Sequence, residues 1–220
     1  MKYENPIYIY PPRPQLYNKD SIPKLFNNGD WWAQIKLDDT RNLIILKPDG
    51  GIDLYNRHAE KHRGYCNPHP DLIKSFDSLA LDRTKYQVFD SLLLHNKNAL
   101  VKDTIVLMDI LVYDGDYLYQ VSYEDRYGIL NKVCNTPTEL EKKSGLELGM
   151  KVTDKLWLIQ NFEGDFEALY KKWETKFLNG QRIVEGLVFK KKAGGLGYHF
   201  TSDKCNWQGK IRYPKKNYDF

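Results

Sequence analysis

Residues 31–46 read WWAQIKLDDTRNLIIL, two apolar runs separated by a short charged segment. Runs of this length that are rich in aromatic and branched side chains predict two β-strands. The charged segment brings Lys36, Asp38 and Arg41 together at the end of the first strand. A lysine amine has a pKa of about 10.4 in water, so it becomes a nucleophile only where burial and neighbouring charges change its protonation. The segment therefore predicts a reactive site only if other parts of the chain supply partners.

Three later segments offer such partners. Residues 184–190 (VEGLVFK) hold an acid and a base within an apolar run. Residues 106–115 (VLMDILVYDG) predict a second strand, which an Asp-Gly turn closes. Residues 207–212 (WQGKIR) carry Lys210 and Arg212 at alternate positions, which lie on one face of a strand.

Strands outnumber helices in the rest of the chain, and this predicts an α+β fold with antiparallel sheets. The expected strands lie near 31–37, 42–47, 52–56, 86–94, 104–113, 183–191 and 207–213. One helix is expected from about Pro70 to Leu79, and Ser122 with Asp125 forms the capping pattern of a second. A third is indicated by apolar residues at helical spacing that pack in the core: Phe166, Leu169, Tyr170, Trp173 and Phe177.

The length of 220 residues and a hydrophobic content of 41% predict a single packed domain over residues 1–220. Residues 1–25 are expected to form an extended N-terminal arm because prolines are dense there. Residues 142–149 read as a flexible connection. The chain has no apolar run of about 18 residues and no apolar signal sequence at its N-terminus, so a cytoplasmic monomer without a membrane partner is expected. Three widely spaced cysteines, Cys66, Cys134 and Cys205, are expected to be reduced.

The net charge of +4 is small, but the basic residues are unevenly distributed. Residues 190–216 contain eight lysines and arginines against one acid, Asp203. Aromatic residues interleave this basic segment, among them Tyr198, His199, Phe200, Trp207 and Tyr213. A basic segment with aromatic residues favours contact with the phosphates of a nucleic acid over a plain solvated surface. No GxxxxGK[ST] or GxGxxG motif is present, which argues against a P-loop kinase or a dinucleotide enzyme.

Taken in order, the motifs resemble the covalent nucleotidyltransferase superfamily of ATP-dependent DNA ligases, RNA ligases and mRNA capping enzymes. The family's K-x-D-G-x-R motif is matched by residues 36–41, with Asp39 in the place of the glycine. Its E-G-x-V-x-K motif is matched at every position by residues 185–190, and its K-x-K/R motif by residues 210–212. The resemblance is greatest to the adenylation domain of ATP-dependent DNA ligases.

The resemblance implies two antiparallel sheets flanking a nucleotide cleft. The chain ends eight residues after Arg212, so a C-terminal OB-fold is not expected. The implied activity is an ATP-dependent and Mg²⁺-dependent polynucleotide ligase that seals 5′-phosphate and 3′-OH ends through a lysine-AMP intermediate. Nicked DNA is the favoured substrate, with RNA as an alternative. An RNA guanylyltransferase and a catalytically weakened relative that binds nucleotide or nucleic acid remain open as further alternatives.

The resemblance also assigns roles to individual residues. The catalytic residues would be Lys36, Asp38 and Arg41. The nucleotide would be bound by Gln34, Ile35, Arg57, Met108, Lys190, Lys210 and Arg212. The metal would be bound by Glu185 and Asp90.

Three positions depart from the family pattern. Leu92 stands in the place of the glutamate of the D-G-E strand motif, and Asp90, two residues earlier, shares its facing from one pleat away. Asp39 replaces a glycine and would be strained if the backbone there had a positive φ. Met108 stands where the family commonly has an aromatic residue that stacks on the base, which a thioether replaces only in part. The Leu92 departure predicts a slow enzyme, and the three departures together support the alternative of a relative that binds without reacting.

Overall fold

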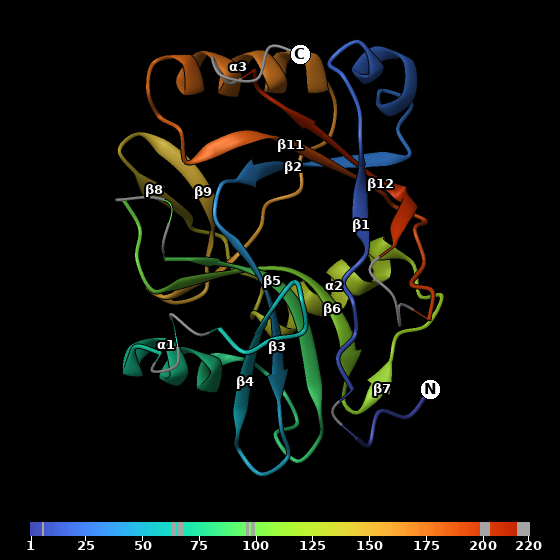
Figure 1. Cartoon of the computed structure of the whole chain (residues 1–220), viewed down its shortest axis with the longest axis vertical. Coiled ribbons are helices and arrows are strands. Elements are labelled where there is room, and N and C mark those ends of the chain that lie inside the picture. Colours follow the sequence, from blue (N-terminus) through green and yellow to red (C-terminus); the bar gives the residue numbers. More distant parts are fainter. Residues whose placement is uncertain are drawn as a thin grey trace.

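The computed structural model describes residues 1–5, 7–62, 65, 68–95, 97, 100–198 and 203–214, which form an α+β fold with two β-sheets (Figure 1). The predicted fold class is confirmed. Several residues considered above lie outside the described residues: Cys66, His199, Phe200, Lys215 and Lys216. Cys134 and Cys205 are free thiols, as predicted. None of the helices formed by the described residues is long and apolar enough to cross a bilayer.

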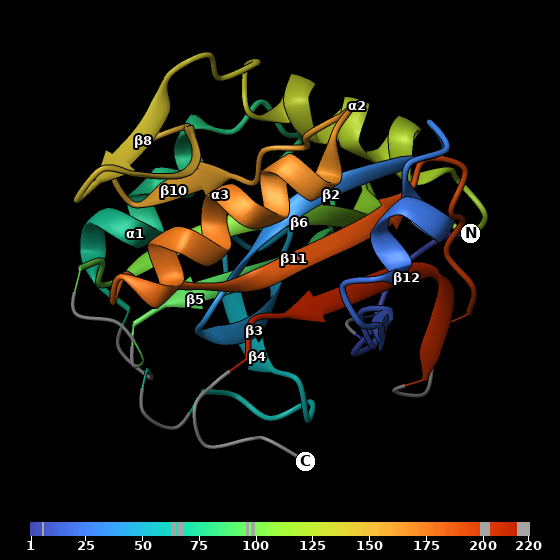
Figure 2. The ribbon, with the colours of Figure 1, turned by 90° about the horizontal axis from the view of Figure 1, so that it is seen from above.

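The smaller sheet has the strand order β1-β12-β11-β2. Its strands are β1 (Arg13–Leu16), β12 (Lys204–Arg212), β11 (Val184–Lys191) and β2 (Trp31–Leu37). Helix α3 (Phe166–Leu178) lies over β11 and β2 when the molecule is seen from above (Figure 2). The helix buries Phe166, Tyr170, Trp173 and Phe177 against this sheet, so the predicted core helix is confirmed.

Successive side chains along the strands of the smaller sheet alternate between the core and the opposite face of the sheet. On β11, Leu187 and Phe189 are fully buried in the same core cluster as α3. Their neighbours Val188 and Lys190 line the cleft on the other face of the sheet. Successive side chains of a strand point to opposite faces, so packing under α3 fixes which residues reach the cleft.

The larger sheet has the order β4-β3-β5-β6-β10-β9-β8, and β7 pairs with β6. Its strands are β3 (Thr40–Leu46), β4 (Ile52–Asn56), β5 (Gln87–Leu94), β6 (Thr104–Tyr113), β7 (Asp116–Tyr117), β8 (Leu140–Lys143), β9 (Leu146–Lys151) and β10 (Leu156–Leu158). Helices α1 (Pro70–Ser75) and α2 (Tyr123–Val133) and the 3₁₀ turn η3 (Phe76–Ser78) contribute to its second core cluster. The Ser122 side chain accepts a hydrogen bond from the Asp125 amide at 3.1 Å, which confirms the predicted cap of α2.

Most strand pairs are antiparallel, as predicted, but each sheet also contains one parallel pair: β1 with β12, and β10 with β6. The N-terminal segment contains β1 and a π-helical turn, η1 (Ile22–Phe26). The prediction of a flexible connection over 142–149 is wrong, because this segment lies in β8, a turn and β9. Leu146 and Leu148 on β9 are fully buried, but the charged residues and glycines around them hid this two-residue alternation.

Candidate active site

A cleft of about 880 Å³ lies between the two sheets. One wall comes from β2, β11 and β12, and the other from β3, β5 and β6. The sequence-predicted residues that line this cleft are Gln34, Ile35, Lys36, Arg41, Arg57, Asp90, Met108, Glu185, Lys190, Lys210 and Arg212. Asp38 does not line the cleft but adjoins it at the end of β2. Folding therefore brings together residues that are spread over most of the chain.

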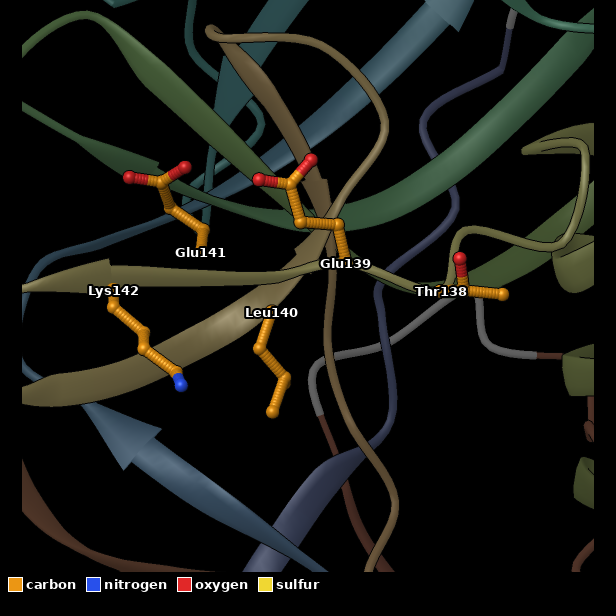
Figure 3. A pocket seen from close by; sticks show the side chains of 5 residues that line it. All are labelled: Thr138, Glu139, Leu140, Glu141 and Lys142. Atoms are coloured by element: carbon orange, nitrogen blue, oxygen red, sulfur yellow. The ribbon is translucent and has the colours of Figure 1, made fainter.

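A second hollow lies beside β8 and is lined by Thr138, Glu139, Leu140, Glu141 and Lys142 (Figure 3). Glu139 and Glu141 project to one side of the strand in this view, and Lys142 projects to the other. The carboxylate of Glu141 is already paired with Lys143 at 3.0 Å. The hollow contains none of the predicted site residues, so the cleft between the sheets is the candidate active site.

Lys36 and Glu185 form an ion pair inside the cleft. Lys36 Nζ donates to Glu185 Oε1, and Arg212 Nη2 lies 3.7 Å from the same oxygen. Burial lowers the pKa of the Lys36 amine, while Glu185 opposes that shift by favouring the charged form. The result is a lysine whose pKa lies below its ordinary value and whose amine a carboxylate positions.

Gly186 explains how Glu185 reaches this position. Gly186 has a φ of +153°, and a Cβ there would lie 1.9 Å from the carbonyl oxygen of Ile211 on β12. Only glycine allows the two backbones to approach so closely. The glycine of the E-G-x-V-x-K motif thus sets the packing of β11 on β12, which carries Arg212.

Arg41 and Asp90 form a bidentate pair across the larger sheet. Arg41 Nε donates to Asp90 Oδ1 at 2.8 Å, and Arg41 Nη2 donates to Asp90 Oδ2 at 2.7 Å. Arg41 Nη2 also donates to the Pro12 carbonyl at 3.0 Å, which ties the N-terminal segment to the cleft. Asp90 and Leu92 both line the cleft, so the prediction that they face the same side of β5 is confirmed.

Lys190 is held in the cleft by one contact from β6 and one from α2. Its Nζ donates to the Met108 carbonyl at 3.0 Å and lies 4.3 Å from the centre of the Tyr123 ring. Burial lowers the pKa of Lys190 to about 8, although Asp109 acts to raise it. Asp109 is in turn fixed by two 2.9 Å hydrogen bonds from Arg126, which is fully buried.

Gln34 lies two residues before Lys36 on the cleft face of β2 and is 2% exposed. Its Nε2 donates to the Tyr123 hydroxyl at 2.7 Å and to Asn161 Oδ1 at 2.8 Å. Ile35 also lines the cleft, but its side chain packs in the core with α3, so its main chain is the part that faces the cleft. Tyr123 and Asn161 are site residues that the sequence did not predict.

Asp38 and Asp39 bind the segment that follows β5. Asp38 Oδ1 lies 3.2 Å from Lys97 Nζ. Asp39 Oδ2 accepts from the backbone amides of His95 at 2.9 Å and Lys97 at 3.3 Å. Asp39 does not have a positive φ, so the strain considered for this replacement of a family glycine is not present. Asp39 instead holds the backbone amides of His95 and Lys97, a role without any local sequence signal.

Lys210 and Arg57 add positive charge to the cleft. Burial lowers the pKa of Lys210 to about 8, and repulsion from Arg212 and Lys36 acts in the same direction. Arg57 Nε lies 3.0 Å from His58 Nε2 at the end of β4. Cations that converge from β2, β4, β11 and β12 make the cleft suited to a polyphosphate or to the backbone of a nucleic acid.

The acidic residues of the cleft allow one metal position. Among the described residues no group of three or more His, Cys, Asp or Glu side chains could hold a metal ion. Mg²⁺ commonly uses only one or two carboxylates together with water and substrate phosphates, so Glu185 fits such a site. Both oxygens of Asp90 accept hydrogen bonds from Arg41, so its carboxylate serves that arginine, and its metal role stays a prediction.

Comparison with known proteins supports the fold. No family model matches the chain, and no curated protein matches it in sequence. The ligase domain of LigD from M. tuberculosis is similar with a TM-score of 0.60 at 16% identity, over 91% of this chain and 59% of that one. Mycobacterial DNA ligase D in complex with ATP gives a TM-score of 0.62 at 16% identity, over 93% and 60%.

The ATP-dependent DNA ligase of bacteriophage T7, also in complex with ATP, gives a TM-score of 0.57 at 15% identity, over 92% of this chain and 68% of that one. This chain therefore spans about three-fifths of the length of the two mycobacterial structures. At these identities the likeness establishes the fold alone, which this chain shares with these DNA ligase structures.

Proposed function

We propose that this chain is an ATP-dependent polynucleotide ligase that acts on DNA and transfers AMP from ATP to Lys36. The observation that carries this proposal is the position of Lys36. Its amine lies in a cleft, is bonded to Glu185, has a lowered pKa and is surrounded by further cations. The fold of DNA ligases and the two ATP complexes among the similar structures support the choice of ATP and DNA.

The first step is the attack of the Lys36 amine on the α-phosphorus of ATP. An N–P bond forms, the bond to the bridging oxygen breaks, and pyrophosphate leaves. The attacking nitrogen must be neutral, and burial favours that form by lowering its pKa. The amine then loses a proton, and Glu185 Oε1 is its hydrogen-bond partner in the free protein.

Charge on the phosphoryl oxygens is stabilised by the cations of the smaller sheet. Lys190 reaches the cleft from β11, and Lys210 and Arg212 reach it from β12. Phosphoryl transfer depends mainly on positioning and on such electrostatic stabilisation. Mg²⁺, when bound with the phosphates, would neutralise further charge, and Glu185 is the residue that would hold it.

The nucleic acid would then receive the AMP on its 5′-phosphate, and the 3′-OH of the neighbouring end would displace AMP. Arg57 at the mouth of the cleft is suited to the 5′-phosphate because a guanidinium binds phosphate through two parallel hydrogen bonds. Arg41 is held in a fixed orientation in the cleft by Asp90, where it would lie near the ribose of the bound nucleotide.

The test is covalent labelling. The protein is incubated with Mg²⁺ and α-labelled ATP or GTP and is then run on a denaturing gel. Wild-type protein should retain label, and Lys36→Ala should not. Lys24→Ala is the matched control, because Lys24 is an exposed lysine on η1 outside the cleft. Retention of label by Lys36→Ala would refute the role of Lys36.

A second assay distinguishes the polynucleotide substrates. Sealing of a nicked DNA duplex supports a DNA ligase, whereas sealing of nicked RNA alone supports an RNA ligase. Transfer of a labelled guanylate to a 5′-diphosphate RNA end supports a guanylyltransferase.

Leu92 favours one alternative, a relative that binds nucleotide without reacting. Leu92 is 8% exposed and packs in the core cluster where the family's D-G-E motif has a carboxylate. Such a protein would bind ATP but would form no covalent adduct.

A further inference from the structure

Three polar side chains form a connected relay that reaches the cleft: Gln34 on β2, Tyr123 on α2 and Asn161 after β10. Gln34 is the member that lines the cleft. Tyr123 is fully buried behind it, and its hydroxyl lies 3.3 Å from the Met108 carbonyl and 3.4 Å from Asn161 Oδ1. Tyr123 and Asn161 lie 89 and 127 positions after Gln34 in the sequence, so only the fold brings the three together.

The relay leaves one end of each amide without a protein partner among the described residues. Both inward hydrogen bonds of Gln34 use Nε2, so Oε1 is the end left for the cleft. Asn161 Nδ2 is buried and has no hydrogen-bond partner in the described part of the chain. A buried amide N–H without a partner is costly, so an alternative arrangement that satisfies it competes with the first.

That alternative reverses every donor and acceptor in the relay. If both amides turn over, Gln34 Oε1 accepts from Asn161 Nδ2 and from the Tyr123 hydroxyl, and Gln34 Nε2 faces the cleft. The Tyr123 hydroxyl can rotate to donate because it stays protonated, since burial raises its pKa well above the ordinary value. The first arrangement keeps the bond from Tyr123 to Met108 but leaves Asn161 Nδ2 without an acceptor among the described residues. The second gives Asn161 Nδ2 an acceptor, loses the bond to Met108, and leaves Asn161 Oδ1 in the buried position that Nδ2 held. Each arrangement therefore leaves one end of the Asn161 amide without a partner in this part of the chain.

The end that Gln34 presents decides which base edge it can bind. A carbonyl oxygen accepts from the 6-amino group of adenine, whereas an N–H donates to the 6-oxo group of hypoxanthine or guanine. A glutamate at this position could only accept. We infer that Gln34, Tyr123 and Asn161 form a reversible relay that lets the cleft bind both 6-amino and 6-oxo purine nucleotides. This inference rests on the proposed function, because it assumes that the cleft holds the nucleotide whose phosphate Lys36 attacks.

The test compares the binding of ATP and ITP, which differ at position 6 and in the proton at N1. Dissociation constants are measured by calorimetry on the Lys36→Ala protein, so that binding is read without covalent reaction. With the relay intact, the two constants should differ by less than about tenfold, since each base finds a complementary amide end.

Two variants should each lock the relay in one direction. Gln34→Glu removes the donor that faces the cleft. Asn161→Asp provides only acceptors behind Gln34 and so holds its Nε2 inward, although residue 161 does not line the cleft. Both should raise the preference for ATP to about a hundredfold, because a 6-oxo group then meets an acceptor. Tyr3→Phe is the matched control, since its hydroxyl donates to the Ile7 carbonyl at 2.6 Å, outside the relay.

A preference for ATP of about a hundredfold in the protein with the relay intact would overturn this inference and leave the proposed function standing. An unchanged ratio of the ATP and ITP dissociation constants in Asn161→Asp would also overturn it. Asn161 would then have no effect on which base Gln34 binds. If neither nucleotide binds, both the inference and the proposed function are wrong.

Discussion

Replacing Glu185 by glutamine separates two effects that this carboxylate has on Lys36. Glu185 Oε1 accepts from Lys36 Nζ, and it also lies near Arg212. Its negative charge favours the charged form of the lysine and therefore raises the pKa of Lys36 against the effect of burial. Glutamine keeps an acceptor oxygen but removes the charge, so the pKa of Lys36 should fall further below its ordinary value.

The two consequences for adenylation have opposite directions. Loss of the carboxylate removes the group that would hold Mg²⁺ at the phosphates, so the maximal rate should fall by about a hundredfold or more. Attack requires the neutral amine, and the rate therefore rises with pH as Lys36 loses its proton. A lower pKa of Lys36 in Glu185→Gln moves this rising limb to lower pH.

The assay is single-turnover labelling with ATP and Mg²⁺ across a pH series. Glu147→Gln is the matched control, because Glu147 pairs with Lys172 at 3.2 Å away from the cleft and should leave both readouts unchanged. An unchanged maximal rate would refute the metal role of Glu185. A rising limb displaced to higher pH would refute the account of how Glu185 and burial set the protonation of Lys36.

Three further predictions follow from the cleft and its support. ATP should bind Lys36→Ala more weakly as pH rises above about 8, because the pKa values of Lys190 and Lys210 lie near 8 and the loss of their charges removes attraction for phosphate. An ATP affinity that stays constant with pH, measured by calorimetry, would contradict this. Leu92→Glu should raise the labelling rate by about ten- to a hundredfold, because it supplies a carboxylate that lines the cleft. If the variant folds and its labelling rate does not rise, the D-G-E motif has been placed at the wrong residues. Asp109→Asn should lower the free energy of unfolding in urea by about 3 to 5 kcal/mol, since it leaves the charge of the fully buried Arg126 without its ionic partner, and unchanged stability would be inconsistent with that pair.

The strands that carry the cleft could be predicted because their pattern is local. The apolar runs of β2, β3, β5, β6 and β11 are long, and the motif residues lie within or directly beside them. Lys36 and Glu185 are 149 residues apart, yet the order of the motifs was enough to expect them in one cleft, and the structure brings them into contact.

Other parts could not be predicted, because their causes are not local. The short strands β8 and β9 are held by the packing of Leu146 and Leu148 in the core, while their flanking residues are polar. Asp39 stands in the place of a family glycine, and its role as an acceptor for two amides depends on His95 and Lys97, which are 56 and 58 residues away. Asn161 shows no motif or periodic pattern, and only the contact with Gln34 identifies it.

The central claim is that Lys36 becomes covalently linked to AMP. The most direct measurement is mass spectrometry of the peptides produced by proteolysis after incubation with ATP and Mg²⁺. One adenylylated peptide is expected, which contains Lys36 as the modified residue, and no adduct is expected in Lys36→Ala. An adduct on a different residue, or bound ATP that never forms an adduct, would contradict the account.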